Sequence, residues 1–293
     1  SRHPPKRRSV NDAERKTMGK FLISIDELKD RIGTADCPPI FDVRRRPFYD
    51  EQTTILPTAR WRDHMASDHW MRGVAPGTEV VVYCVHAHNV SQCAVAALRA
   101  RSVNARVLER GIEGWKEAGG LVIAKDALPH RDEDIESVWV TRIRPKIDRI
   151  ACPWLIRRFI NREAQFLFVE PEQVVPVAGE IGGIPYDVPD VDLSHEGENC
   201  TFDTLIKRFA INDPALARLA DIVRGADTAR PGLAPEAAGL LAVSLGISAL
   251  SGDNDHAAVE RGMQVYDALY AWQRYAADET HNWPSAQDTG QAA

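Results

Sequence analysis

The sequence predicts a two-domain α/β protein in which a parallel sheet with helices on both faces precedes a second, mainly helical α+β domain. The chain has 293 residues, of which 44% are hydrophobic, and at roughly 100–200 residues per domain this length suggests two domains. From Phe21 onward, short apolar runs alternate with helical stretches, which is typical of a parallel α/β sheet. Beyond Thr201 the pattern becomes mainly helical.

Composition excludes several classes of protein. The 36 Lys and Arg residues are outnumbered by 42 Asp and Glu residues, for a net charge of −6, so the basic surplus of a nucleic-acid-binding surface is lacking. The longest apolar stretch, residues 237–250, is interrupted by Gly239 and Gly246 and is shorter than the ~20 residues that cross a bilayer. The five cysteines are an odd number and too sparse for a disulfide scaffold. We therefore expect a cytoplasmic protein that binds neither nucleic acid nor membrane.

Polar segments indicate the domain boundaries. Residues 1–17 are polar and lack the apolar core of an export signal, so we expect a flexible arm there. The first domain is placed at residues 18–122. A linker over 123–136 separates it from a second domain at 137–276, because this segment is acidic and lacks hydrophobic periodicity. The polar residues 277–293 are expected to form a flexible tail.

The first domain contains three aliphatic runs that are too short to be helices. They predict buried strands over residues 39–43, 80–83 and 106–108. The alanine-rich segment 90–100, between the last two strands, predicts a helix. One helix between consecutive strands is the βαβ unit of a parallel sheet.

The second domain begins with a predicted strand over residues 137–141. A helix that starts at Pro153 and a strand over 165–169 follow it. Apolar residues at helical spacing then predict four further helices, over residues 201–211, 214–224, 235–250 and 255–275.

Cys84 stands directly after the predicted strand 80–83 and shortly before the next helix. In a parallel α/β sheet this position lies at the carboxyl ends of the strands, where ligands bind. Loop N–H groups and the positive end of the helix would stabilise a thiolate there, so Cys84 is a candidate nucleophile. The alternative is that it is a small buried hydrophobic residue. The expected substrate-binding loop consists of Val85, His86, Ala87, His88, Asn89, Val90 and Ser91.

Over about residues 19–120 the chain resembles the rhodanese family of sulfurtransferases. The resemblance is carried by four motifs, Phe41-Asp-Val-Arg44, Pro57-Thr-Ala59, Val80-Val-Val-Tyr-Cys84 and Arg110-Gly-Ile-Glu-Gly-Trp115. It implies a rhodanese-like fold, and a reaction in which Cys84 takes a sulfane sulfur from a donor such as thiosulfate, holds it as a persulfide and passes it to a thiophilic acceptor, with no cofactor required. It also implies that Asp42 and Arg44 form a supporting ion pair.

Two features of the loop bear on its substrate. Val90 occupies the position where a phosphatase-type loop carries an arginine, which disfavours phosphate-ester hydrolysis. Val85 and Ala87 stand where many rhodanese loops have a basic residue and a glycine. The positive side chains of the loop are therefore expected to be His86 and His88.

Basic residues gather near the start of the second domain, at Arg142, Arg144, Lys146 and Arg149. Alternate residues of a strand share one face, so Arg142 and Arg144 are expected to converge and hold an oxyanion. The alternative is a solvated rim that pairs with acidic neighbours. Cys152 is either a second reactive thiol or a core residue under Trp154.

A second cluster brings an imidazole, a thiol and a carboxylate within nine residues, at His195, Cys200 and Asp203. Zinc or iron needs three or four such ligands, so these residues are candidate metal ligands. Their spacing matches no standard pattern and leaves the metal unknown. The alternative places Asp203 in the first turn of a helix and Cys200 in the core.

Residues 137–274 resemble the carboxyl-terminal domain of the ChrB-type chromate-resistance family. Motifs that carry this resemblance include Cys152-Pro-Trp-Leu-Ile-Arg-Arg158, Asp187-Val-Pro189, Leu193-Ser-His195, Cys200-Thr-Phe-Asp203 and Arg224-Gly-Ala-Asp-Thr228. The resemblance implies a link to chromate tolerance, and the chromate dianion suits the arginine cluster. Regulatory members of that family have a different amino-terminal half, which disfavours a transcriptional regulator here.

The leading hypothesis is a cytoplasmic sulfurtransferase of the thiosulfate type that is linked to chromate resistance. Its partners would be a small sulfur donor and a thiophilic acceptor, with chromate or another oxyanion at the second domain. Two alternatives remain open: a non-catalytic protein that senses chromate or binds an oxyanion or metal, and a chromium–thiol detoxification enzyme. The sequence leaves open the physiological donor and acceptor, the oligomeric state and the coupling between the domains.

Overall fold

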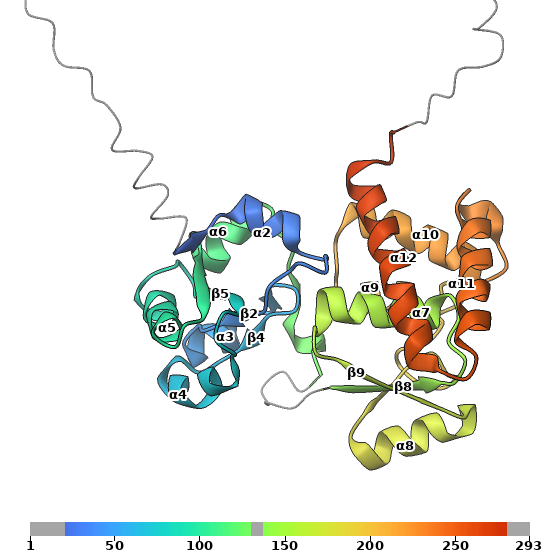
Figure 1. Ribbon diagram of the computed structural model, residues 1–293, viewed down its shortest axis with the longest axis horizontal. Helices are drawn as coiled ribbons and strands as arrows, with labels where there is room; N and C mark the ends of the chain where they lie inside the picture. The colour runs from blue at the N-terminus through green and yellow to red at the C-terminus, as the bar shows by residue number, and fades with distance from the viewer. Residues whose placement is uncertain (1–20, 130–136, 280–293) are drawn as a thin grey trace, which may run out of the picture.

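The computed structural model describes residues 21–129 and 137–279 (Figure 1). Its first part is built on a five-stranded sheet in the order β1-β6-β5-β2-β4, and every neighbouring pair of strands is parallel. The strands are β1 (Leu22–Ile23), β2 (Ile40–Asp42), β4 (Arg60–Trp61), β5 (Glu79–Tyr83) and β6 (Asn104–Leu108). The predicted parallel α/β sheet is confirmed.

Helices cover both faces of this sheet because successive side chains of a strand point to opposite sides. Val80 and Val82 pack in one apolar cluster with residues of α4 and α5. Val81 and Tyr83 pack in another cluster that includes residues of α2, α3 and α6. Cys84 continues the alternation and lies on the α5 side. The helices are α2 (Ile25–Arg31), α3 (Arg46–Glu51), α4 (Ser67–Trp70), α5 (Asn89–Ala100) and α6 (Gly111–Glu117).

The second part has a three-stranded parallel sheet in the order β10-β8-β9. Its strands are β8 (Val138–Arg142), β9 (Gln165–Val169) and β10 (Ile184–Pro185). Val140 packs toward α8 (Val174–Ile181) on one face, whereas Trp139 packs in the large helical cluster on the other. The helices of that cluster are α7 (Asp148–Leu155), α9 (Thr201–Arg208), α10 (Pro214–Asp227), α11 (Ala237–Ser251) and α12 (Asp255–Tyr275). The mainly helical α+β part is confirmed (Figure 1).

Short helical turns connect these elements. They are 3-10 turns at η1 (His64–Ala66), η2 (Met71–Gly73), η3 (Lys125–Ala127), η5 (Pro171–Gln173) and η6 (Pro231–Leu233), and a π-helical turn at η4 (Ile156–Ile160). Within the two described ranges, no helix is long and apolar enough to cross a membrane.

The prediction that a helix starts at Pro153 is wrong. Helix α7 begins at Asp148, and Pro153 lies inside it. The helix begins after Ile147, because the φ of 37° at this residue lies outside the right-handed helical region. Since proline has no N–H, Pro153 removes one helical hydrogen-bond donor, and the α-helix gives way to the π-helical turn η4 after Leu155.

Part of the predicted linker 123–136 is packed structure. Strand β7 (Ile123–Ala124) pairs antiparallel with β3 (Thr54–Ile55). Lys125 is buried and donates a hydrogen bond to the carbonyl oxygen of Tyr49. The acidic remainder at 130–136, the predicted arm over 1–17 and most of the predicted tail lie outside the described residues.

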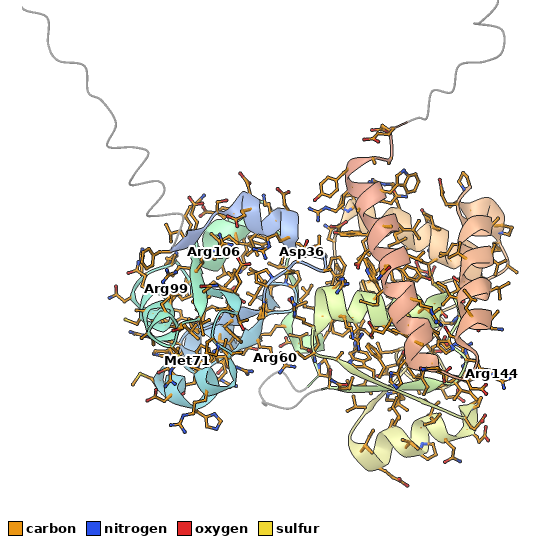
Figure 2. The ribbon with its side chains drawn as sticks, viewed as in Figure 1. Asp36, Arg60, Met71, Arg99, Arg106 and Arg144 are labelled. Atoms are coloured by element: carbon orange, nitrogen blue, oxygen red, sulfur yellow. The ribbon has the colours of Figure 1, made fainter. Side chains whose placement is uncertain are left out.

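The two parts share one apolar core. A single cluster of buried residues includes Trp115 of the first part and Trp154 and Phe159 of the second. The Thr58 N–H donates to the carbonyl oxygen of Phe159 at 3.0 Å. Around this core, Arg60 projects toward the second part (Figure 2) and donates to Asn161 at 3.1 Å.

Helix α12 reaches back to α2. Arg274 donates to the carbonyl oxygens of Lys29 and Ile32, each at 3.1 Å. Gly33 has a φ of +79°, and a Cβ there would lie 2.5 Å from Phe159 and 2.9 Å from Tyr270. Only glycine allows the two rings to approach the backbone so closely.

Candidate functional site

The structure places Cys84 at the carboxyl end of β5, at the entrance to α5. Its side chain is only 6% exposed, and Sγ lies 3.2 Å from Oγ of Ser91. Ser91 Oγ also donates to the carbonyl oxygen of His88 at 3.2 Å. The end of the predicted loop, at His88 and Ser91, thus lies beside the sulfur.

Two backbone hydrogen bonds from α6 hold the base of this loop. The N–H groups of Ile112 and Glu113, in the first turn of α6, donate to the carbonyl oxygens of Cys84 and Val85 at 3.0 and 3.2 Å. Gly111 has a φ of +62°, and a Cβ there would lie 2.5 Å from each of these oxygens. The conformation of the loop thus depends on a residue far from it in the sequence.

A cavity of about 310 Å³ opens above Cys84. Its lining includes Arg45, His86 and His88, and of the described residues that line it, none is acidic. From the sequence alone, only the two histidines of the loop are expected to be positively charged near Cys84. The full lining is Arg44, Arg45, Phe48, Cys84, Val85, His86, His88, Asn89 and Val90. Arg45, in the segment that follows β2, thus adds a positive charge to the cavity that the composition of the loop did not indicate.

Asp42 and Arg44 form an ion pair in which neither side chain is exposed. Nε of Arg44 lies 2.8 Å from Oδ2 of Asp42, which also accepts from the Tyr83 hydroxyl at 2.8 Å. Burial beside Asp42 raises the pKa of Tyr83 well above its usual value, so the phenol remains a donor. This is the supporting arrangement that the rhodanese resemblance implies.

Arg44 contributes to the lining of the cavity above Cys84 although its side chain is buried. Among the described residues none accepts a hydrogen bond from its buried Nη1. A cation-lined cavity with a thiol at its floor suits a nucleophilic reaction on a small anion.

In the second part, the predicted basic residues divide into two groups. Arg142 and Arg149 converge on the buried Asp187, at 2.8 and 3.2 Å from its Oδ2. Arg144 and Lys146 point to solvent; the side chain of Arg144 is 71% exposed (Figure 2). The expected convergence of Arg142 with Arg144 is not found, because β8 ends at Arg142 and the alternation of a strand does not continue beyond it.

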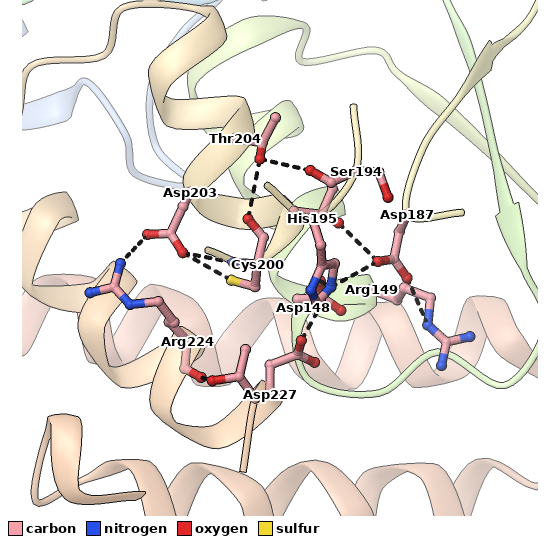
Figure 3. A network of polar contacts seen from close by, with 12 residues as sticks. Asp148, Arg149, Asp187, Ser194, His195, Cys200, Asp203, Thr204, Arg224 and Asp227 are labelled. Atoms are coloured by element: carbon pink, nitrogen blue, oxygen red, sulfur yellow. Dashed lines mark hydrogen bonds and ion pairs between the residues drawn. The ribbon is translucent and has the colours of Figure 1, made fainter. Parts of the chain in front are cut away.

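His195 lies at the centre of three carboxylates (Figure 3). Its Nε2 is 3.3 Å from Asp148, 3.4 Å from Asp187 and 3.5 Å from Asp227. Asp148 is the first residue of α7, Asp227 is the last residue of α10, and Asp187 follows β10. Four separate segments thus meet at one point near the carboxyl ends of β8 and β10.

The charges at this point shift one another's pKa values. Interaction with the carboxylates of Asp148 and Asp187 raises the pKa of His195 to about 10. Burial, together with the charge of Asp148, raises the pKa of Asp227 to about 7. Burial also raises the pKa of Asp148. Perturbed groups of this kind cluster at functional sites.

Cys200 and Asp203 do not join His195 as predicted. They form the start of α9, where Oδ2 of Asp203 accepts from the N–H of Cys200 at 3.0 Å and from its Sγ at 3.3 Å. Oδ1 of Asp203 pairs with Arg224 at 2.7 Å. Cys152 is fully buried in α7, and burial raises the pKa of both thiols. Cys200 and Asp203 therefore cap α9, and Cys152 is part of the core.

Sequence reasoning missed Asp148, Asp187 and Asp227. Each had a weak signal, because Asp148 lies inside the basic segment, and Asp187 and Asp227 lie inside segments already singled out beside His195 and Arg224. From the sequence, Asp148 is a partner of the neighbouring basic residues, and Asp187 and Asp227 only belong to motifs of the ChrB resemblance, whereas the fold brings all three to the imidazole.

Comparisons with known proteins divide the chain in the same way. Residues 24–118 match the sequence model of the rhodanese-like domain, and residues 139–273 match that of the ChrB C-terminal domain. Protein ChrB of Cupriavidus metallidurans is 34% identical over 133 residues, which cover 45% of this chain and 39% of that protein. The match therefore spans well under half of that relative.

Solved structures similar to the chain include two rhodanese proteins. A rhodanese-related protein from Thermoplasma volcanium is 20% identical, over 35% of this chain and 96% of that one, with a TM-score of 0.31. A rhodanese-like domain protein from Staphylococcus aureus is 21% identical, over 32% of this chain and 90% of that one, with a TM-score of 0.30. From the two sequence models, the chain carries a rhodanese-like domain at residues 24–118 and a ChrB C-terminal domain at residues 139–273.

Proposed function

We propose that the protein is a sulfurtransferase that uses Cys84 as its nucleophile. The observation that carries this proposal is the position of the Cys84 sulfur, at the carboxyl end of β5 and at the floor of a cavity of about 310 Å³ with cationic residues in its lining. Parallel sheets bind ligands at this edge, and an anionic sulfur donor matches the charge of the lining.

The reaction consists of two displacements at sulfur. In the first, the Cys84 thiolate attacks the outer sulfur of thiosulfate; a new S–S bond forms, and the S–S bond of the donor breaks with its electron pair leaving on sulfite. In the second, a thiophilic acceptor such as cyanide attacks the terminal sulfur of the persulfide, and the electron pair returns to Cys84. Electrons balance between the two steps, so no cofactor is required.

The residues around the sulfur have distinct roles in this scheme. Arg45, His86 and His88 line the cavity and would hold the anionic donor and the departing sulfite. The Ser91 hydroxyl, 3.2 Å from Sγ, would turn its one hydrogen from the His88 carbonyl oxygen to the thiolate. Arg44 acts mainly through its ion pair with Asp42, which keeps the end of β2 in place beside the loop.

We further propose that this activity serves chromate tolerance, on the strength of the ChrB C-terminal domain that follows it. The five unpaired cysteines support a cytoplasmic location. The shared core packs the two domains against each other, so that sulfur chemistry and any oxyanion handling would occur in one molecule.

Thiocyanate formation from thiosulfate and cyanide tests the proposal. We expect turnover by the wild type and none by Cys84→Ser. The matched control is Cys93→Ser, which removes an exposed thiol from α5 and should leave turnover unchanged. After incubation with thiosulfate alone, intact mass spectrometry should show one added sulfur, about 32 Da, on wild type but not on Cys84→Ser. Absence of both turnover and adduct with several donors would favour a non-catalytic, chromate-sensing protein instead.

A further inference from the structure

The group around His195 in the second domain has features of a metal site that the sulfur-transfer proposal does not use. Ligand atoms of Asp148, His195 and Asp227 all lie within 4.8 Å of one another. They come from the start of α7, the segment before α9 and the end of α10. Three side chains from distant segments thus point toward one small volume (Figure 3).

His195 lies within ion-pair range of these carboxylates, but the distances are longer than those of a charge-assisted hydrogen bond. A charge-assisted N–H···O bond to a carboxylate is about 2.7–2.9 Å long, whereas Nε2 of His195 lies 3.3 Å from Asp148 and 3.5 Å from Asp227. Around a tetrahedral metal with bonds of about 2.0–2.2 Å, the ligand atoms lie about 3.3–3.6 Å apart. The separations of Nε2 from the two carboxylates match the edges of such a polyhedron.

A proton on His195 cannot satisfy the whole group. Nε2 carries at most one hydrogen, and it faces three carboxylates. Asp187 has other partners, since Oδ1 accepts from Thr201 at 2.8 Å and Oδ2 pairs with Arg142 and Arg149. Oδ2 of Asp148, by contrast, has no hydrogen-bond partner among the described residues.

Asp148 supplies the second observation. The residue is 2% exposed, and within the described part of the chain its buried Oδ2, which faces His195, has no hydrogen-bond partner of ordinary geometry. A buried carboxylate oxygen without a partner is costly and requires an explanation, of which a bound ion is one.

We propose that Asp148, His195 and Asp227 bind a divalent first-row transition-metal ion. Asp187, already neutralised by its two arginines, is a positioning residue that anchors its loop beside the ion. Two carboxylates and one imidazole suit Mn²⁺, Fe²⁺ or Zn²⁺, whereas softer Cu⁺ prefers sulfur. The nearby Cys200 thiol is engaged by Asp203.

The site has an open side. The side chain of His195 is 41% exposed and that of Asp227 15% exposed, so an ion can enter from solvent past these two residues. Three protein ligands leave at least one coordination position for water or a small anion, as in catalytic rather than structural metal sites.

Titration of the metal-stripped 293-residue chain with Mn²⁺ tests this proposal, with calorimetry for affinity and electron paramagnetic resonance for the bound ion. We expect one Mn²⁺ per chain. Asp148→Asn and Asp227→Asn should each weaken binding at least about tenfold. Asp192→Asn, at an exposed acid three residues before His195, and Cys84→Ser should bind as the wild type does.

A second measurement decides the question without variants, should Asp148→Asn fail to fold. Bound Mn²⁺ should broaden the amide signals of Asp148, His195 and Asp227 in the NMR spectrum of the wild type, and leave those of the first domain sharp. The proposal is overturned if neither Mn²⁺ nor Zn²⁺ binds the wild type, if the two variants bind unchanged, or if the broadening centres elsewhere. These readouts do not involve sulfur transfer, so each proposal can fail alone.

Discussion

Replacing Gly111 by alanine tests whether the first turn of α6 holds the Cys84 loop in its working geometry. The new Cβ would lie 2.5 Å from the carbonyl oxygens of both Cys84 and Val85, and atoms of this kind essentially never approach closer than 3.0 Å. The loop base or the helix must therefore move by roughly half an ångström, a displacement at which catalytic geometry begins to fail.

The expected magnitudes follow from two separable costs. An alanine in the left-handed conformation that Gly111 adopts costs about 1–2 kcal/mol, and crowding against the rigid backbone adds about 1–3 kcal/mol. We expect Gly111→Ala to lose about 2–5 kcal/mol of unfolding free energy in urea. Because the displaced carbonyls belong to the nucleophile and its neighbour, thiocyanate formation should fall about tenfold or more.

Gly119→Ala is the matched control. Gly119 has a φ of +69°, close to that of Gly111, but a Cβ there would have nothing within 4 Å. It should lose only the conformational cost of about 1–2 kcal/mol and retain wild-type turnover. Equal losses of stability in the two variants, or full activity in Gly111→Ala, would refute the reasoning that close approach of the backbone makes this glycine necessary.

Three further predictions concern the fold. Phe159→Ala should cost about 3–5 kcal/mol in a single unfolding transition, because the ring lies in the core that both domains share; two separate transitions in the wild type would contradict this. The hydrogen bond from Arg31 lowers the pKa of Glu79 to about 2. The wild type should therefore be more stable than Glu79→Gln above pH 4.5, and this difference should vanish as the pH falls toward 2. A difference in urea midpoint that stays constant over this range would argue against the ion pair. Asp203→Ala should lower the free energy of unfolding by about 1–2 kcal/mol through the lost cap of α9, and should bind Mn²⁺ as the wild type does. Loss of Mn²⁺ binding in this variant would show that Asp203 belongs to the metal site.

The sequence predicted best those elements whose ends carry local signals. Helix α12 spans the predicted residues 255–275, and Asn254 caps it by accepting from the N–H of Ala257 at 2.9 Å. The start of α7 lacked such a signal. It depends on Ile147, a β-branched residue at φ 37°, a conformation that only the surrounding structure maintains. Tyr266, far along the chain, holds that turn by donating to the carbonyl oxygen of Ile147 at 2.8 Å.

The two sites show the same contrast. Cys84 could be located because a strand, a loop and a helix in direct succession determine where it lies. The arginine beside it in the cavity, Arg45, and the carboxylates around His195 could not, because they meet only when separate segments fold together. Spacing along the chain selected Cys200 and Asp203 as partners of His195, whereas a helix cap uses both.

The return of α12 to α2 affects how the chain folds during synthesis. The carbonyl groups of Lys29 and Ile32, and the ring contacts at Gly33, are completed only by Tyr270 and Arg274, among the last described residues to leave the ribosome. The domain that contains α2 therefore emerges with one edge uncovered and stays so until α12 has been synthesised. Truncation before residue 255 should leave that edge exposed, and fragments of either domain should aggregate where the full chain does not.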